Sequence, residues 1–349
     1  MARYILSDPN FSAGKDKEVV EQIVNPFRDR PGIKLIGYEP DPDFDRLPIE
    51  LLGRPEAMME ALLEAAGKAY ELIDMEKQHG HHPRIGAVDT IEVYPVREIT
   101  IDECRDFAQE LGTELFNRFS VPVYFTGKNA RRPDREGLTF IRKGNYEGLR
   151  EAVLKDPDRA PDIGPRKLHP TAGATIVGAL EEHDAYFNVV LDTTDLSIAK
   201  KLASYVRGRT GGFTNIQGVI GLPNIHRRTG KECVIVSCEI SNPLKTPIHR
   251  VFNLLRDEAA RYGVNVLGGQ ICGTIGAEVL VQTAEWYLKL EGLNGPWDYR
   301  ARFSKAIFWS LRHSRSDPTI HQASSSVPPA TARSTSGTLR PFGMSRVIR

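Results

Sequence analysis

The chain has few of the features that mark membrane, secreted or disulfide-rich proteins. It has four cysteines among 349 residues, at positions 104, 233, 238 and 272, and they form no C-x-x-C pair. This scatter suits a reducing compartment with buried or inert thiols. No apolar run approaches a membrane span, and the first eight residues lack the apolar core of a secretory signal. We therefore expect a cytoplasmic protein with no membrane partner.

An excess of charge of one sign is also missing overall, since 46 basic and 45 acidic residues leave a net charge of +1. The balance is uneven along the chain. From Trp297 onward nine Lys and Arg face two Asp, a net +7, whereas residues 1–296 hold 37 basic and 43 acidic groups, a net −6. A mildly acidic body argues against a nucleic-acid partner. No G-x-G-x-x-G follows a strand, so dinucleotide binding has no support.

The first half of the chain alternates strand-like and helix-like segments, which predicts an α+β layer of helices on one sheet. The expected strands are 3–6, 33–38, 47–52, 88–94 and 121–125, and the expected helices are 15–27, 55–75 and 100–119. Thr100 to Glu103 is a capping box that begins the third helix. The turn-rich segment Pro9 to Gly14 is predicted to be a loop, and residues 130–162 to be a connecting region.

The second half gives strand, helix, two strands, helix, strand, which is the ferredoxin-like order. The expected strands are 185–191, 215–221, 233–240 and 264–267, and the expected helices are 196–207, the one ending near Tyr262, and 276–290. We expect two ferredoxin-like subdomains, at residues 1–180 and 181–296. The remainder, 297–349, is basic and rich in Ser, Thr and Pro, and we expect this C-terminal tail to be disordered.

The loop from Gly80 to Asp89 is the first candidate for chemistry, because His79, His81 and His82 lie within four residues. Imidazole can take and give a proton near neutral pH. Pro83 confines the backbone of His82 and so fixes its direction better than that of the other two histidines. Arg84 suits bidentate binding of a carboxylate. A base beside a carboxylate clamp indicates an anionic substrate that loses a proton.

Other interpretations of these segments stay open on the residues alone. The three histidines with Glu39 or Asp41 could ligate a metal, although no second His or Cys group has metal-site spacing. The acidic loop 39–46 is either a solvated turn or a set of carboxylates that orient His82. The Gly- and Pro-punctuated loop 162–175 is either a linker or a ligand-binding segment. A basic cluster either steers a polyanion or is a solvated surface; its members are Lys128, Arg131, Arg132, Arg135, Arg142 and Lys143.

Several motifs, in order along the chain, resemble the glutamate formimidoyltransferase family over residues 3–293. They are Pro9-Asn10-Phe11-Ser12-x-Gly14, Leu72-Ile73-Asp74-Met75, His82-Pro83-Arg84-Ile85-Gly86-Ala87-x-Asp89, Val121-Pro122-Val123-Tyr124, Ile141-Arg142-x-Gly144-x-Tyr146-Glu147, Pro161-Asp162-x-Gly164-Pro165, Gly173-Ala174-Thr175 and Gly178-Ala179. The family moves the formimino group of N-formimino-L-glutamate to N-5 of tetrahydrofolate, in histidine breakdown.

This resemblance implies folate bound between two ferredoxin-like subdomains of a homodimer, with tetrahydrofolate as co-substrate and no metal. It places the catalytic histidine at His82, with Arg84 and Glu39 as further catalytic candidates. It also implies a folate-binding segment, made of Gly164, Pro165, Arg166, Lys167, Leu168, His169, Pro170, Thr171, Ala172 and Gly173. The folate it would bind could be polyglutamylated.

The resemblance also implies a mechanism in which His82 takes a proton from the attacking folate nitrogen and returns it to the departing glutamate nitrogen. This chain departs from many relatives at His81, Glu39 and Asp45, where Glu, Asp and Asn respectively are common. Two alternatives therefore remain: transfer of a formyl group between 5-formyltetrahydrofolate and glutamate, or a folate-binding protein without catalysis.

Overall fold

The computed structural model describes residues 3–80 and 82–291. Its first sheet has seven strands in the order β1-β4-β2-β5-β7-β6, with β3 pairing to β4. The strands are β1 Tyr4–Ser7, β2 Asn10–Phe11, β3 Ile33–Tyr38, β4 Leu47–Gly53, β5 Val88–Arg97, β6 Val123–Gly127 and β7 Thr175–Ala179. Strands β5, β7 and β6 run parallel, and the other pairs are antiparallel.

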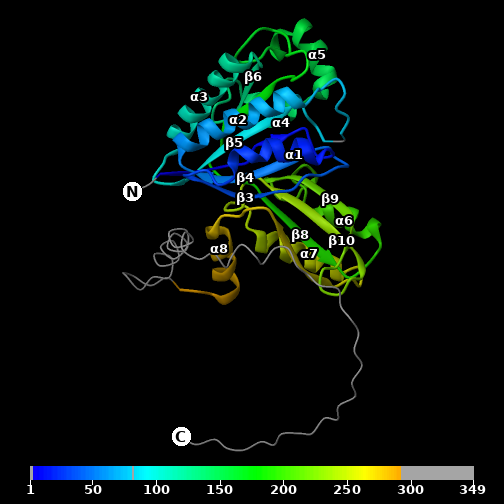
Figure 1. Cartoon of the computed structure of the whole chain (residues 1–349). Coiled ribbons are helices and arrows are strands. Elements are labelled where there is room, and N and C mark those ends of the chain that lie inside the picture. Colours follow the sequence, from blue (N-terminus) through cyan, green and yellow to red (C-terminus); the bar gives the residue numbers. More distant parts are fainter. Residues whose placement is uncertain (1–2, 81, 292–349) are drawn as a thin grey trace, which may run out of the picture. The chain divides into compact units, whose positions relative to one another are not determined.

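Helices α1 (Lys17–Val24), α2 (Pro55–Leu72) and α3 (Ile101–Phe119) pack beside one another and against the sheet (Figure 1). The predicted capping box is present: Thr100 Oγ accepts from the Glu103 backbone N–H, and the Glu103 carboxylate accepts from the Thr100 backbone. Proline stands at the first turn of α2, where its missing N–H costs nothing. All three predicted helices are confirmed, with α2 ending three residues before the expected Met75.

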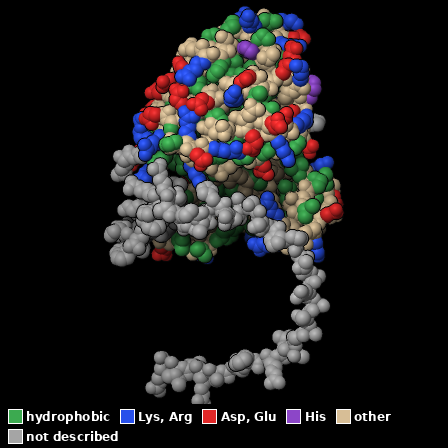
Figure 2. Space-filling view, viewed as in Figure 1, with side chains coloured by type: hydrophobic (Ala, Val, Ile, Leu, Met, Phe, Trp, Pro, Cys, Tyr) green, Lys and Arg blue, Asp and Glu red, His purple; other side chains and the backbone are tan. Residues whose placement is uncertain are grey.

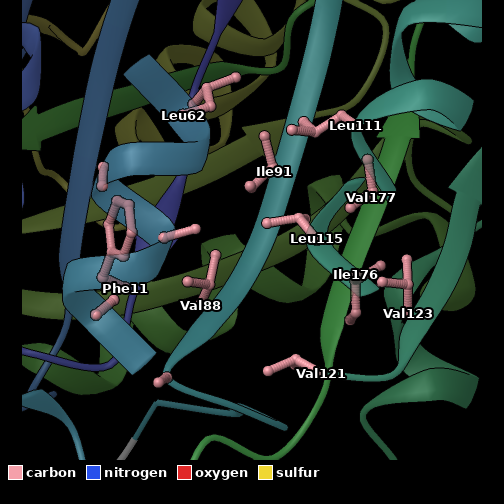
Figure 3. Close-up of a cluster of buried hydrophobic side chains, with 14 of the residues drawn as sticks. Phe11, Leu62, Val88, Ile91, Leu111, Leu115, Val121, Val123, Ile176 and Val177 are labelled. Carbon is pink, nitrogen blue, oxygen red and sulfur yellow. The ribbon is translucent and has the colours of Figure 1, made fainter. Parts of the chain in front are cut away.

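The core of this half lies between the helices and the sheet. Figure 3 shows Leu62 of α2 and Leu111 and Leu115 of α3 meeting Ile91 of β5 and Val177 of β7. All five are fully buried. Burying such a side chain stabilises the fold by about 1.5–3 kcal/mol, so this cluster fixes the position of β5, and with it the loop that leads into β5.

Two predictions about loops are wrong, and one strand was not predicted. The segment Pro9 to Gly14 contains β2, which is only two residues long and lies between β4 and β5. The connecting region 130–162 contains helices α4 (Leu138–Ile141) and α5 (Asn145–Lys155). Strand β7 occupies 175–179; it is buried on both faces, so it lacks the alternation that marks a half-exposed strand.

The second sheet is antiparallel throughout, in the order β11-β8-β10-β9. Its strands are β8 Ala185–Leu191, β9 Ile216–Ile225, β10 Glu232–Ile240 and β11 Val266–Cys272. Helices α6 (Leu196–Val206) and α7 (Ile248–Ala260) pack on it, and α8 (Ala277–Leu288) packs against α7. The predicted element order of this half is confirmed.

Acidic and basic side chains are interspersed over the face seen in Figure 2. In the part of the chain that the structure describes, no helix is both long and apolar enough to cross a membrane. The tail predicted at 297–349 lies outside the described residues.

Candidate functional site

His82 lines a small pocket at one end of the first sheet. The residues around it come from β2 and its following loop, from the β3–β4 loop and from the loop that enters β5; they are Asn10, Phe11, Ser12, Asp45, Arg46, His82, Arg84 and Asp89. The loops meet closely because of a glycine. A Cβ at Gly80 would lie 2.1 Å from the Phe44 carbonyl oxygen, so no side chain fits there.

Arg84 forms the frame of the His82 loop. It is buried, and its guanidinium donates to both carboxylate oxygens of Glu147 at 3.0 and 2.7 Å. It also donates to the Gln78 side-chain oxygen at 2.7 Å and to the Gln78 carbonyl at 3.1 Å. Gln78 in turn donates to the Asp45 carbonyl. The fork that suits a carboxylate is therefore occupied by Glu147 in this structure.

Asp89 fixes the other end of the loop. One of its carboxylate oxygens accepts from the Ile85 N–H at 2.8 Å, and the other accepts from Arg142 at 2.5 Å. Asp45 is likewise engaged, accepting from the backbone N–H groups of Gly14 and Lys15. Both pocket carboxylates therefore serve to hold loops.

His82 is held neutral by its surroundings. Burial, together with the positive charges of Arg46, Arg142 and Arg84, lowers the pKa of its imidazole to about 3. A hydrogen bond with the Pro83 backbone opposes this effect. Because proline has no N–H, that bond must run from an imidazole N–H to the carbonyl, which leaves the other ring nitrogen as an acceptor. The arrangement presents an unprotonated imidazole to the pocket.

The predicted folate segment runs alongside this loop. The Ala87 N–H donates to the Ala172 carbonyl at 2.9 Å, and the Ala174 N–H donates to the Ile85 carbonyl at 3.1 Å. A Cβ at Gly86 would lie 2.1 Å from the Ala174 carbonyl oxygen, so this close approach requires glycine. Sequence segments more than 80 residues apart are thus joined backbone to backbone.

Within the segment the two ends differ in exposure. Residues 164–167 are exposed, whereas Leu168 is buried, and so are Ala172 and Gly173. The His169 imidazole accepts from the Ala172 N–H at 3.0 Å, and burial lowers its pKa. The segment therefore combines a fixed end beside His82 with an open end that carries Arg166 and Lys167.

The structure brings together two of the three predicted catalytic residues. His82 and Arg84 both line the pocket. Glu39 is exposed and is not among the lining residues; its charge acts instead on Cys272 of β11. Sequence reasoning missed Asn10 and Arg46, although both lie in segments it singled out, the Pro9 motif and the acidic loop.

Arg46 carries an unused donor. Its Nε is buried and has no hydrogen-bond partner, and burial lowers the pKa of its guanidinium. Arg142 has the same unpartnered Nε, while another of its nitrogens holds Asp89. Two cations with free donors beside a neutral imidazole make a site for an anion.

Most of the basic cluster has local partners. Arg132 pairs with Asp134 and Asp158, and Arg135 is buried against Asp162 at 3.0 Å. Lys128 pairs with Glu181. These pairs favour a structural role for the cluster, with Arg142 as the member that reaches the site.

Buried carboxyl groups lie on β5, between β1 and β2, and just before β8. Burial, together with the charges of Asp8 and Asp184, raises the pKa of Glu92 on β5 to about 8. Burial likewise raises the pKa of Asp184 to about 7. Asp8 is 3.5 Å from His183, and this contact raises the pKa of His183 against the effect of its burial.

Within residues 3–80 and 82–291, no group of three or more His, Cys, Asp or Glu side chains is placed to hold a metal ion. His81, one of the histidines that the metal interpretation requires, lies outside the described residues.

Comparison with known proteins identifies the family. Residues 4–180 match the formiminotransferase domain, N-terminal subdomain, and residues 185–295 match the formiminotransferase domain. The chain belongs to the formiminotransferase family. The expected resemblance is confirmed.

Two relatives are single-activity enzymes by name. The glutamate formimidoyltransferase of Streptococcus pyogenes serotype M1 is 37% identical over 291 residues, which cover 83% of this chain and 95% of the relative. The glutamate formimidoyltransferase of Thermoplasma acidophilum is 35% identical over 288 residues, which cover 82% of this chain and 92% of the relative. The formimidoyltransferase-cyclodeaminase of Sus scrofa is 35% identical over 84% of this chain but only 54% of its own length.

Proposed function

We propose that this protein is a glutamate formimidoyltransferase, which moves the formimino group of N-formimino-L-glutamate to N-5 of tetrahydrofolate and releases L-glutamate. One observation carries the proposal: in a member of this family, a neutral imidazole at His82 lies in a pocket joined backbone to backbone to the segment 164–173. An acceptor nitrogen beside a second substrate segment suits proton transfer between two bound amines.

In the proposed reaction, N-5 of tetrahydrofolate attacks the formimino carbon, and a bond forms between them. His82 takes the proton from N-5 in the tetrahedral intermediate. It then gives that proton to the glutamate nitrogen as the carbon–nitrogen bond to glutamate breaks. One imidazole acts first as base and then as acid, so no other proton source is needed.

The arginines give the substrate a way to raise the low pKa of His82. N-formimino-L-glutamate carries two carboxylates. Bound near Arg46 and Arg142, they would offset the positive charges that depress the pKa of His82. The anionic substrate thereby raises the basicity of the group that acts on it. In this proposal Arg84 acts by holding the loop through Gln78 and Glu147.

We propose that residues Gly164 to Gly173 bind the folate, with the exposed Arg166 and Lys167 facing the glutamate tail of the folate, polyglutamylated or not. We propose that Glu39 affects the pocket only at long range, through its negative charge, since it is exposed and not among the lining residues.

The finer features of the family extend the proposal. We propose two ferredoxin-like subdomains, at 1–180 and 181–296, with folate between them, in a cytoplasmic homodimer that uses no metal. The β11-β8-β10-β9 order supports this for the second subdomain. The first sheet adds parallel strands to that plan.

The test is a product assay with two donor mixtures. Purified full-length protein is incubated with tetrahydrofolate and N-formimino-L-glutamate, and the methenyl chromophore is followed after acid treatment. A second mixture holds 5-formyltetrahydrofolate and glutamate, where the product measured is N-formyl-L-glutamate, and each mixture is repeated with a chelator. Product from the first mixture, unaffected by chelator, supports the proposal. Product only from the second, or from neither, contradicts it.

A further inference from the structure

Asn10 presents a hydrogen-bond acceptor that nothing in the protein uses. The residue is 6% exposed and lines the pocket with His82. Its side-chain oxygen, Oδ1, is buried and has no hydrogen-bond partner. A buried acceptor without a partner is costly, and such groups in native proteins mark places where a ligand or water completes the bonding.

The orientation of the Asn10 amide is determined by its other end. Nδ2 donates to the Asp8 carbonyl oxygen at 3.0 Å. Rotating the amide by half a turn would set two oxygens against each other, so Oδ1 must be the atom left over. The pocket therefore meets an acceptor at this position and not a donor.

The backbone of Asn10 is equally constrained. Strand β2 pairs on one side with β4, where Asn10 faces Pro48, and on the other with β5, where it faces Thr90. Ser12 then bonds twice to the His82 loop, through its N–H to the Ala87 carbonyl at 2.9 Å and through its hydroxyl to the Gly86 carbonyl at 2.8 Å. Asn10 and the loop that carries His82 are thus held in one frame.

The other polar side chains of the pocket that contain oxygen each have a partner in the protein, and Arg46 has only a donor left over. Ser12 donates its hydroxyl proton to the protein, and Asp45 and Asp89 accept from it. Among the described lining side chains, Asn10 Oδ1 is the buried acceptor that has no partner in the protein, and His82 offers its free ring nitrogen. The reaction brings three N–H groups to the pocket, on N-5 of the folate, on the formimino nitrogen and on the glutamate nitrogen, and of these only the formimino N–H is missing from a formyl donor. His82 must remove the first of these protons, and a neutral amide cannot remove a proton.

We infer that Asn10 Oδ1 accepts a hydrogen bond from the formimino N–H and so selects formimino over formyl donors, an inference that rests on the proposed function. A formyl group has an oxygen where the formimino group has N–H. Placed at the same point, that oxygen would face Asn10 Oδ1 with no proton between them. A site built to hydrogen-bond a substrate N–H rejects the analogue that lacks it, because the acceptor is then left unpaired.

The experiment compares two donors that differ only at this atom, N-formimino-L-glutamate and N-formyl-L-glutamate, in the full-length protein and in Asn10→Leu. We expect Asn10→Leu to lower kcat/KM for the formimino donor by roughly tenfold or more, as for a lost bond to a charged group, without lowering it for the formyl donor. The matched control is Asn188→Leu. Asn188 is also buried with an unpartnered Oδ1 but is not among the residues that line this pocket, so its donor ratio should stay unchanged.

Equal losses for both donors in Asn10→Leu would overturn the inference, since a merely structural role affects both alike. If the variant does not fold, the affinities of the unmodified protein for the two donors test the inference. In a competition assay, N-formyl-L-glutamate should bind at least about tenfold more weakly than N-formimino-L-glutamate. Equal affinity would overturn the inference. If the unmodified protein uses neither donor, the proposed function fails instead.

Discussion

The electrostatic setting of His82 should be measurable as a dependence of stability on pH. Its folded-state pKa of about 3 lies below its ordinary value of 6.5. The unfolded chain therefore takes up a proton at His82 in mild acid, and the folded protein does not. The stability that this group contributes is present above pH 6.5 and is lost progressively as the pH falls toward 3. His82→Gln removes the titrating group and should remove this loss.

The size of the effect follows from linkage. Between pH 6.5 and pH 5 the unfolded state titrates over about 1.5 pH units, at about 1.4 kcal/mol per unit. The unmodified protein should therefore lose about 2 kcal/mol more free energy of unfolding than His82→Gln on going from pH 7 to pH 5.

Urea denaturation of both proteins at pH 7, 6 and 5 measures the difference in the free energy of unfolding. The dependence of this free energy on urea concentration should be the same for both proteins, which checks two-state behaviour. Comparing the two proteins cancels the titration of every other group. His79→Gln is the control, since His79 is exposed in the same loop. Parallel stability curves for the unmodified protein and His82→Gln would refute the assigned environment of His82.

Three further predictions concern the frame of the site. Gly86→Ala places a Cβ 2.1 Å from a carbonyl oxygen, so we expect a loss of at least about 2 kcal/mol in urea denaturation. Glu147→Gln weakens the bidentate pair with Arg84 and should lower both stability and kcat. The control is Glu151→Gln on the same helix, where Glu151 forms an exposed ion pair with Lys155. This change should alter stability by less than about 0.5 kcal/mol. Glu92→Gln should remove a loss of stability that begins as the pH rises above the ordinary carboxyl pKa of 4.5 and is complete near pH 8, because the unfolded chain releases this proton at lower pH than the folded protein does; denaturation at pH 5 and pH 8 tests it.

Much of the fold could be predicted from local signals. The capping box at Thr100 located α3, and the apolar run 185–191 located β8 to the residue. Strand β7 was missed because a parallel strand buried on both faces carries no alternation. Strand β2 was missed because its two residues are defined by pairing with β4 and β5, which are distant in sequence.

For the functional site, too, local sequence signals predicted some residues, and the role of others depends on partners that are distant in the sequence. Pro83 and the neighbouring histidines were sufficient to single out His82. The engagement of Arg84 by Glu147 could not be predicted, because that partner lies 63 residues away on α5. Asn10 carried no chemical signal of its own; its role depends on which of its atoms the fold leaves without a partner. Such information exists only in the assembled structure.

The most direct test of the account is turnover by His82→Ala, with His79→Ala as control. Tetrahydrofolate and N-formimino-L-glutamate are supplied, product is measured as the methenyl chromophore, and folate binding is measured separately by titration. We expect His82→Ala to bind folate nearly as well as the unmodified protein but to lose turnover by at least about a hundredfold, and we expect His79→Ala to retain turnover. Turnover near that of the unmodified protein in His82→Ala would contradict the proposed role of this histidine.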